Sequence, residues 1–80
     1  MNEYIATFHT HLSALLTSRE LASRSVKARM MPVPRKLSSS CGTCVRYIAE
    51  DAHLSAMDED VEAVYEKIGK EEYNLLMNAG

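Results

Sequence analysis

The most reactive side chains of this chain stand in one short segment, where Gly42 and Thr43 separate Cys41 from Cys44. A cysteine thiolate is a nucleophile, and exposure, nearby positive charge and backbone amides all favour its formation. Cys41 follows three serines and precedes a glycine, so it lacks the apolar neighbours typical of a buried cysteine. We therefore predict that Cys41 is an exposed, reactive thiol on which the chemistry of the chain depends.

Basic and polar residues flank this thiol in the sequence. A guanidinium presents a fork of donors, so Arg35 and Arg46 could stabilise an anionic sulfur, as could the ammonium of Lys36. Gly42 gives the backbone access to unusual dihedral angles and leaves the sulfur uncrowded. The predicted catalytic positions are Cys41 and Cys44, and the predicted binding positions are Arg35, Ser39, Ser40, Gly42 and Arg46.

The spacing of the two cysteines permits other chemistry as well. Redox proteins use CxxC to close a disulfide, and metal sites use it for two of four ligands. In a straight strand over residues 41–44, the two side chains would point to opposite faces and neither use would be possible. A turn would permit both, and Cys44 is alternatively a core residue.

His9 and His11 offer two nitrogen ligands that could complete a zinc set with the two cysteines. The end of a strand and the start of a helix diverge within two residues, so we expect no metal site and no resident cofactor. Either histidine could instead lie near the Cys41 loop and act as a base.

Length and composition limit the class of protein. Eighty residues, 46% of them hydrophobic, suffice for one domain over residues 1–80. The formal net charge is −2 and the Lys and Arg residues are scattered along the sequence, so we do not expect nucleic-acid binding. Residues 1–5 do not resemble a signal peptide, and no stretch reaches the roughly 20 apolar residues that span a bilayer. We expect a cytoplasmic protein that does not bind membranes.

The elements that position the cysteines can be predicted from the spacing of apolar residues. Residues 3–8 favour a strand, and Thr10 can cap a helix over residues 11–23 whose leucines we place in the core. Residues 26–33 alternate as a second strand, which stops at the prolines, and residues 34–42 form an exposed loop. A third strand over residues 44–48 could pair with the second as a hairpin.

The last third of the chain has two interpretations. In the first, Ser55 or Asp58 begins a helix, Gly69 ends it and residues 73–77 form a strand. Its apolar face would comprise Met57, Val61, Val64 and Ile68. In the second, residues 50–57 form a short helix, residues 61–67 a strand and residues 70–78 a terminal helix. Periodicity favours the first, which gives an α+β, ferredoxin-like βαββαβ fold with an antiparallel sheet and both helices on one face.

Residues 31–47 also resemble a known family. The run Pro32-Val33-Pro34-Arg35, the run Ser39-Ser40-Cys41-Gly42 and the β-rich residues through Arg46 are similar to the putative selenium/sulfur carrier protein-like family. The resemblance implies that Cys41 bears the sulfur or selenium, with Gly42 beside it and Arg35 upstream. Cys44 departs from the plain apolar residue that we expect at this position in many relatives.

This resemblance implies a carrier that takes sulfur or selenium from a donor protein as a persulfide or perselenide on Cys41. The carrier would pass the atom to an acceptor protein and have no turnover of its own. Two other functions stay open, namely a thiol-disulfide redox module using Cys41 and Cys44, and a non-catalytic interaction domain. The edge of a small sheet can pair with a second copy, so a homodimer is possible.

Overall fold

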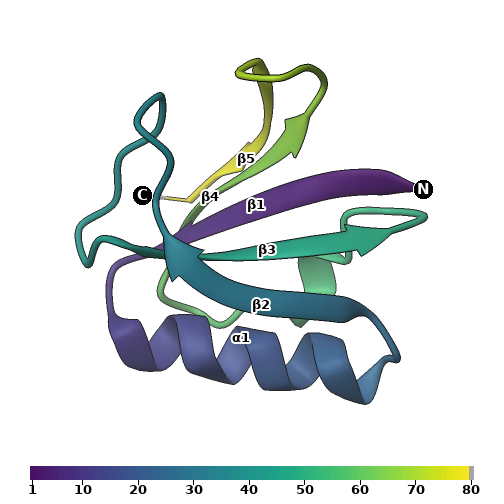
Figure 1. The fold of residues 1–80 in the computed structure, drawn as a ribbon. Coiled ribbons are helices and arrows are strands. Elements are labelled where there is room, and N and C mark those ends of the chain that lie inside the picture. Colours follow the sequence, from purple (N-terminus) through teal and green to yellow (C-terminus); the bar gives the residue numbers. More distant parts are fainter. Residues whose placement is uncertain (80) are drawn as a thin grey trace.

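The computed structural model describes residues 1–79, which form one antiparallel sheet covered on one face by a helix (Figure 1). The sheet order is β2-β3-β1-β4-β5, and every neighbouring pair of strands is antiparallel. The elements are β1 (Asn2–Phe8), α1 (His11–Ser23), β2 (Lys27–Pro32), β3 (Thr43–Ala49), the short 3-10 helix η1 (Leu54–Ala56), β4 (Val61–Lys67) and β5 (Tyr73–Asn78). The predicted α+β class is confirmed.

The first half of the chain folds as the sequence predicts. β1 occupies the centre of the sheet, and α1 begins after Thr10, whose hydroxyl accepts a hydrogen bond of 3.0 Å from the Ser13 amide. This cap satisfies one of the amides that the start of every helix leaves without a partner. β2 and β3 form the predicted hairpin, and the loop between them spans residues 33–42.

The preferred interpretation of the last third was wrong, because the segment predicted as a helix contains strand β4. Its pairing with β1 is irregular, since Thr7 lies opposite Ala63 whereas Phe8 lies opposite Val61. Glu62 is therefore the extra residue of a β-bulge. The bulge allows Val61 and Val64, three residues apart, both to join the core. That spacing imitates the period of an amphipathic helix.

The predicted second α-helix does not occur within residues 1–79, and the connection between β3 and β4 contains only the short helix η1. β4 pairs with the central strand, and the predicted last strand follows it as β5 at the edge of the sheet. A ferredoxin-like arrangement is therefore not confirmed, and the described chain is a five-stranded sheet with a single α-helix. No helix within residues 1–79 is long and apolar enough to cross a membrane.

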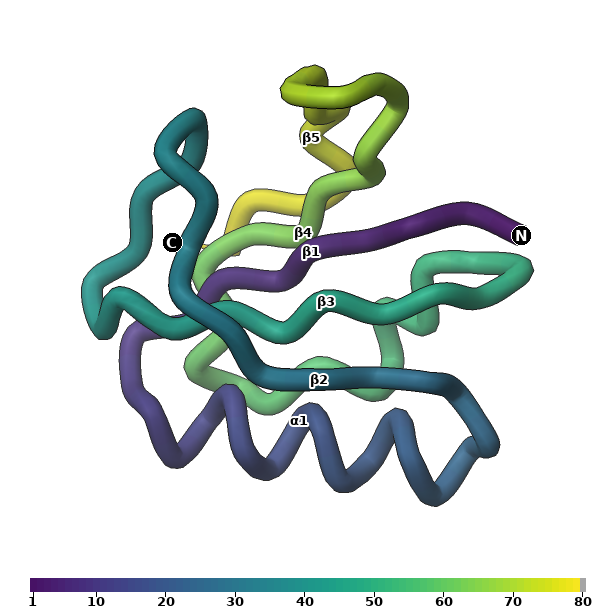
Figure 2. Tube along the Cα trace, viewed as in Figure 1, coloured from purple at the N-terminus to yellow at the C-terminus, as the bar shows by residue number. Residues whose placement is uncertain are grey.

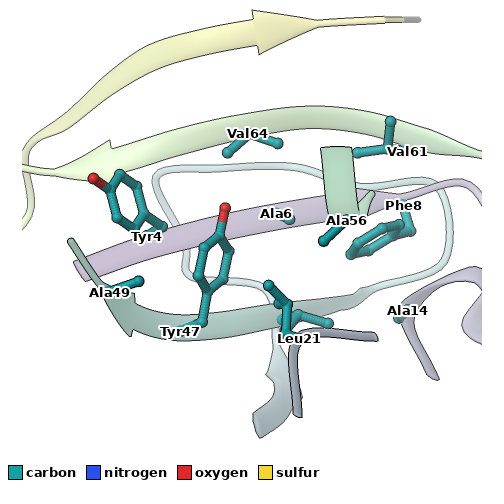
Figure 3. Packing of buried hydrophobic residues seen from close by; sticks show 11 residues of the cluster. Tyr4, Ala6, Phe8, Ala14, Leu21, Tyr47, Ala49, Ala56, Val61 and Val64 are labelled. Carbon is teal, nitrogen blue, oxygen red and sulfur yellow. The ribbon is translucent and has the colours of Figure 1, made fainter. Parts of the chain in front are cut away.

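The main core lies between the sheet and α1 (Figure 3). The Tyr4 and Tyr47 rings stack at its centre with their centroids 5.2 Å apart. The helix contributes small residues and Leu21, whereas Leu12 and Leu16 are 61% and 42% exposed. Our placement of the helix leucines in the core was therefore wrong for these two residues. Small side chains bring α1 close to the sheet, and its buried face is Ser13, Ala14, Thr17 and Leu21.

The opposite face of the sheet is partly enclosed by the connections of the sheet itself. The tube view shows the β2–β3 loop and the β4–β5 hairpin extending away from the side that α1 covers (Figure 2). On this face Ile5, Thr7 and Cys44 are fully buried. The chain leaves the centre of the sheet at Phe8, and this end of β1 is where the loop returns.

Candidate functional site

The loop that carries Cys41 is held against the end of β1. The Ser39 hydroxyl donates a hydrogen bond of 2.8 Å to the carbonyl of Phe8, the last residue of β1. The Val33 amide donates to the Gly42 carbonyl at 3.2 Å and closes the base of the loop. The loop is thus held on both sides of Cys41, by a side-chain hydrogen bond to the central strand and by a backbone hydrogen bond within the hairpin.

Cys41 is half-buried, and its side chain packs against the core on the α1 side. Its thiol donates to the Thr43 carbonyl at 3.5 Å, and the Ser39 oxygen lies 3.8 Å from the sulfur. Gly42 has a φ of 73°, a left-handed conformation that residues with a Cβ adopt only at a cost. A Cβ at Gly42 would have no neighbour within 4 Å, so conformation and not space favours glycine here.

Ser40, directly before the cysteine, is bound by the bulged residue Glu62. The Ser40 hydroxyl donates to Glu62 Oε2 at 2.7 Å, and its amide donates to Oε1 at 3.1 Å. His9 Nδ1 lies 3.3 Å from the same carboxylate and 3.4 Å from the Ser40 oxygen. Burial acts to raise the pKa of Glu62, but the hydrogen bonds from Ser40 and the charge of a protonated His9 outweigh it and lower the pKa.

Cys44 lies in a different environment from Cys41. It is fully buried in β3, opposite Thr7 and Met31, on the face of the sheet away from α1. Its thiol donates to the Pro32 carbonyl at 3.7 Å. Burial, with a smaller effect from the charge of Cys41, raises the pKa of Cys44 to about 11. The protein therefore holds Cys44 as a protonated core residue at neutral pH.

The predicted basic partners of Cys41 lie elsewhere. The Arg46 guanidinium is ion-paired with Glu3 in the middle of the sheet. Within residues 1–79, no hydrogen bond or ion pair joins Cys41 to Arg35, Lys36 or Arg46. The structure thus brings together Ser39, Ser40, Cys41 and Gly42 of the predicted set.

The two histidines lie against the end of the Cys41 loop and the start of β3. His9 contacts Ser40, and His11 Nδ1 lies 3.5 Å from the Thr43 hydroxyl. The two imidazoles therefore contact the residue directly before Cys41 and the residue directly after Gly42. The part of the chain that the structure describes holds no group of three or more His, Cys, Asp or Glu side chains able to bind a metal ion.

The sequence is matched by a family model that carries the description "Putative Se/S carrier protein-like", over residues 3–75. The chain belongs to this family. Searches of curated proteins and of solved structures found no match. The matched range contains every site residue described above, and the family description agrees with the resemblance seen around Cys41.

Glu62 is the site residue that the sequence did not reveal. The preferred interpretation put residue 62 in a helix, and only the pairing of β4 with β1 brings the Glu62 carboxylate to the loop. The second interpretation of the last third, with a strand over residues 61–67, is correct for this segment, but it did not include the pairing of that strand with β1. The bulge that aims Glu62 at Ser40 leaves no signal in the sequence.

Proposed function

We propose that this protein carries sulfur or selenium as a persulfide or perselenide on Cys41 and passes the atom between partner proteins. The observation that carries the proposal is the contrast between the two thiols, since Cys41 is half-exposed and Cys44 is buried and protonated. The family description supports a role in selenium or sulfur transfer. A single accessible nucleophile is what a carrier of one atom requires.

The transfer step exchanges one sulfur–sulfur bond for another. The Cys41 thiolate attacks the outer sulfur of a persulfide on the donor, the sulfur–sulfur bond of the donor breaks, and the donor cysteine leaves as a thiolate. The new bond joins Cys41 to the transferred sulfur, and no net oxidation or reduction occurs. Delivery repeats the exchange, with a nucleophile of the acceptor attacking the terminal sulfur. A perselenide would follow the same course.

Ser39 can support the ionised sulfur. While Cys41 is protonated, its thiol donates to Thr43, and the Ser39 hydroxyl donates to the Phe8 carbonyl. Loss of the thiol proton removes the first of these bonds. Because a hydroxyl hydrogen rotates freely, Ser39 can then turn its donor to the sulfur 3.8 Å away.

A loading experiment tests this proposal. The protein is incubated with a cysteine desulfurase and cysteine, and intact mass is measured under non-reducing conditions. We expect an adduct of the mass of sulfur that reductant removes. The Cys41→Ser variant should lose the adduct, and the matched Cys44→Ser variant should keep it. An adduct that survives in Cys41→Ser would refute the proposal, as would the absence of any adduct on the wild-type protein.

The geometry gives less support to a redox module. The two thiols donate to different carbonyl groups, and Cys41 packs against the α1-side core whereas Cys44 lies on the opposite face of the sheet. A disulfide requires the two Cβ atoms to approach within about 4.5 Å. Closing this bond would therefore require the start of β3 to unpair from its neighbours.

A further inference from the structure

The fold gathers on one face of the sheet basic residues that are scattered in the sequence. The pairing of the strands places Lys27, Arg29, Arg46 and Lys67 on the face opposite α1. Directly opposed residues of antiparallel strands project to the same side, and Arg29 lies opposite Arg46. Basic residues that are far apart in the sequence are therefore neighbours on the surface of the folded protein.

This face carries a charge opposite to that of the chain as a whole. The strand positions that project to this face hold four cations and one carboxylate, Glu3, which gives +3 in a chain of formal charge −2 and leaves −5 for the remainder. Glu3 pairs with Arg46 and lies 4.0 Å from Lys67. Lys27 and Arg29 are exposed, and neither has an ion-pair partner within residues 1–79.

The basic residues repel one another in the isolated protein. Like charges directly opposite on neighbouring strands destabilise a sheet, and Arg29 faces Arg46 in this way. An external anionic group would remove that cost. The β2–β3 loop, which carries Arg35 and Lys36, extends on the same side of the sheet (Figure 1). These loop residues add two positive charges at the β2–β3 end, whereas Lys70, Glu71 and Glu72 of the β4–β5 hairpin add a net charge of −1 at the other end.

The spread of the charges indicates the size of the partner. The four cations extend from β2 to β4, three strand spacings in the observed order, or about 14 Å at ~4.8 Å per strand. A small anion would contact only part of this width. An acidic protein surface can cover it and place several carboxylates against it.

The centre of the same face has no aromatic platform for stacking nucleic-acid bases. Its central positions are Ile5, Thr7 and Cys44, all buried and none aromatic. The two tyrosines of this face, Tyr65 and Tyr73, are half-buried and pack edge to face on one another at its β4–β5 side, with their centroids 6.5 Å apart. Single-stranded nucleic acids bind to exposed aromatic rings and cations together.

We propose that the sheet face opposite α1, centred on Lys27, Arg29, Arg46 and Lys67, binds an acidic surface of a partner protein. This inference goes beyond the carrier function, because charge complementarity on this face does not require Cys41. Screening limits such contacts to short range, since the Debye length is about 10 Å at 0.1 M salt. The interaction should therefore weaken as salt is added.

A decaglutamate peptide serves as the probe of this proposal. Isotope-labelled protein is titrated with the peptide at low salt, and backbone amide shifts are followed by NMR. We expect shifts on β2, β3 and β4 that are reversed by salt. The Lys27→Gln, Arg29→Gln double variant should bind about five- to tenfold more weakly, since it removes two exposed charges without a partner within residues 1–79.

Matched controls make the outcome specific to this face. The Arg19→Gln, Arg24→Gln variant makes the same change in net charge on α1 and the residue after it, and it should bind the peptide as the wild type does. Cys41→Ser should also bind normally, which separates this proposal from the carrier function. Equal weakening by both double variants, or no shifts at all, would overturn the proposal. Tighter binding of decathymidylate than of the peptide would overturn it in favour of nucleic acid.

Discussion

At the scale of single residues, the protein treats its two cysteines differently although only two residues separate them. Cys41 sits where the loop meets the end of β1, and Cys44 lies inside the sheet. The serines and glycine around Cys41 predicted an exposed thiol, whereas the structure makes this side chain half-buried and packs it against the core. The sequence left Cys44 ambiguous, because the burial of Cys44 depends on the strands that pair with β3 on both sides, and the pairing of strands is not visible in a sequence.

Alkylation should separate the two thiols. In the folded protein at neutral pH, iodoacetamide should modify Cys41 at least about tenfold faster than Cys44, because Cys44 is buried and its pKa is raised to about 11. Peptide mapping by mass spectrometry measures both rates. Denaturant should make the two rates similar, and equal rates in the native protein would contradict the assignment.

Glu62 should make stability depend on pH in the acidic range. Its pKa is lowered from 4.5, so its carboxylate contributes stability that is present above that value and lost as pH falls through the lowered pKa. Glu62→Gln should lower the free energy of unfolding by roughly 1–2 kcal/mol at neutral pH, since it weakens charge-assisted hydrogen bonds. The variant should also lose less stability than the wild type as the pH falls. Urea unfolding at a series of pH values measures both effects.

Glu59→Gln is the matched control for this prediction. Glu59 is exposed in the turn before β4. The control should leave the pH dependence as in the wild type. A Glu62→Gln variant with an unchanged acid transition would show that the Ser40 contacts do not stabilise the fold.

At the scale of elements, the sequence predicted β1, α1, the β2–β3 hairpin and β5. It failed where tertiary pairing overrides local periodicity. Residues 57–68 have apolar residues at helical spacing, but the bulge at Glu62 converts that spacing into a strand with both Val61 and Val64 in the core. The prediction that all leucines of α1 lie in the core was also wrong, because mostly small residues form the buried face of this helix.

The two faces of α1 should respond differently to substitution. Leu21→Ala should destabilise the protein by about 2–4 kcal/mol, because Leu21 is fully buried in the core. Leu16→Ala should change stability by no more than about 1 kcal/mol, since this side chain is 42% exposed. Chemical denaturation of both variants measures the difference. Similar costs would mean that the two leucines are buried alike.

The conformation at the end of the β2–β3 loop should favour glycine. Gly42→Ala should cost about 1 kcal/mol, because alanine is strained at a φ of 73°, although its methyl group would meet no neighbour within 4 Å. Gly42→Asn should cost less, because asparagine tolerates left-handed backbone. Denaturation midpoints report the order, and an alanine variant as stable as the wild type would refute it.

At the scale of the whole molecule, the predicted single domain implies one cooperative unit. β3, which holds Cys44, lies between β2 and β1 and contributes to the same sheet as every other strand. Exposure of a residue in the interior of such a sheet requires opening of most of it. Of the whole-molecule properties, net charge could be read from the sequence, whereas the basic face could not, since it arises from the register of four strands.

Cooperativity can be measured through Cys44. In Cys41→Ser, the rate of Cys44 modification should rise with urea with the same denaturant dependence as the global transition followed by circular dichroism. A weaker dependence on urea would show that β3 opens locally. That result would contradict a single cooperative domain.

The extra residue in β4 also shifts the register of this strand against β1. Deletion of Glu62 would bring Val61 and Val64 to the two-residue spacing of a regular strand, so both could still face the core. The Ser40 amide and hydroxyl would, however, lose the carboxylate that accepts their hydrogen bonds. The interior therefore does not require the inserted residue, and what the insertion adds is a carboxylate beside the Cys41 loop.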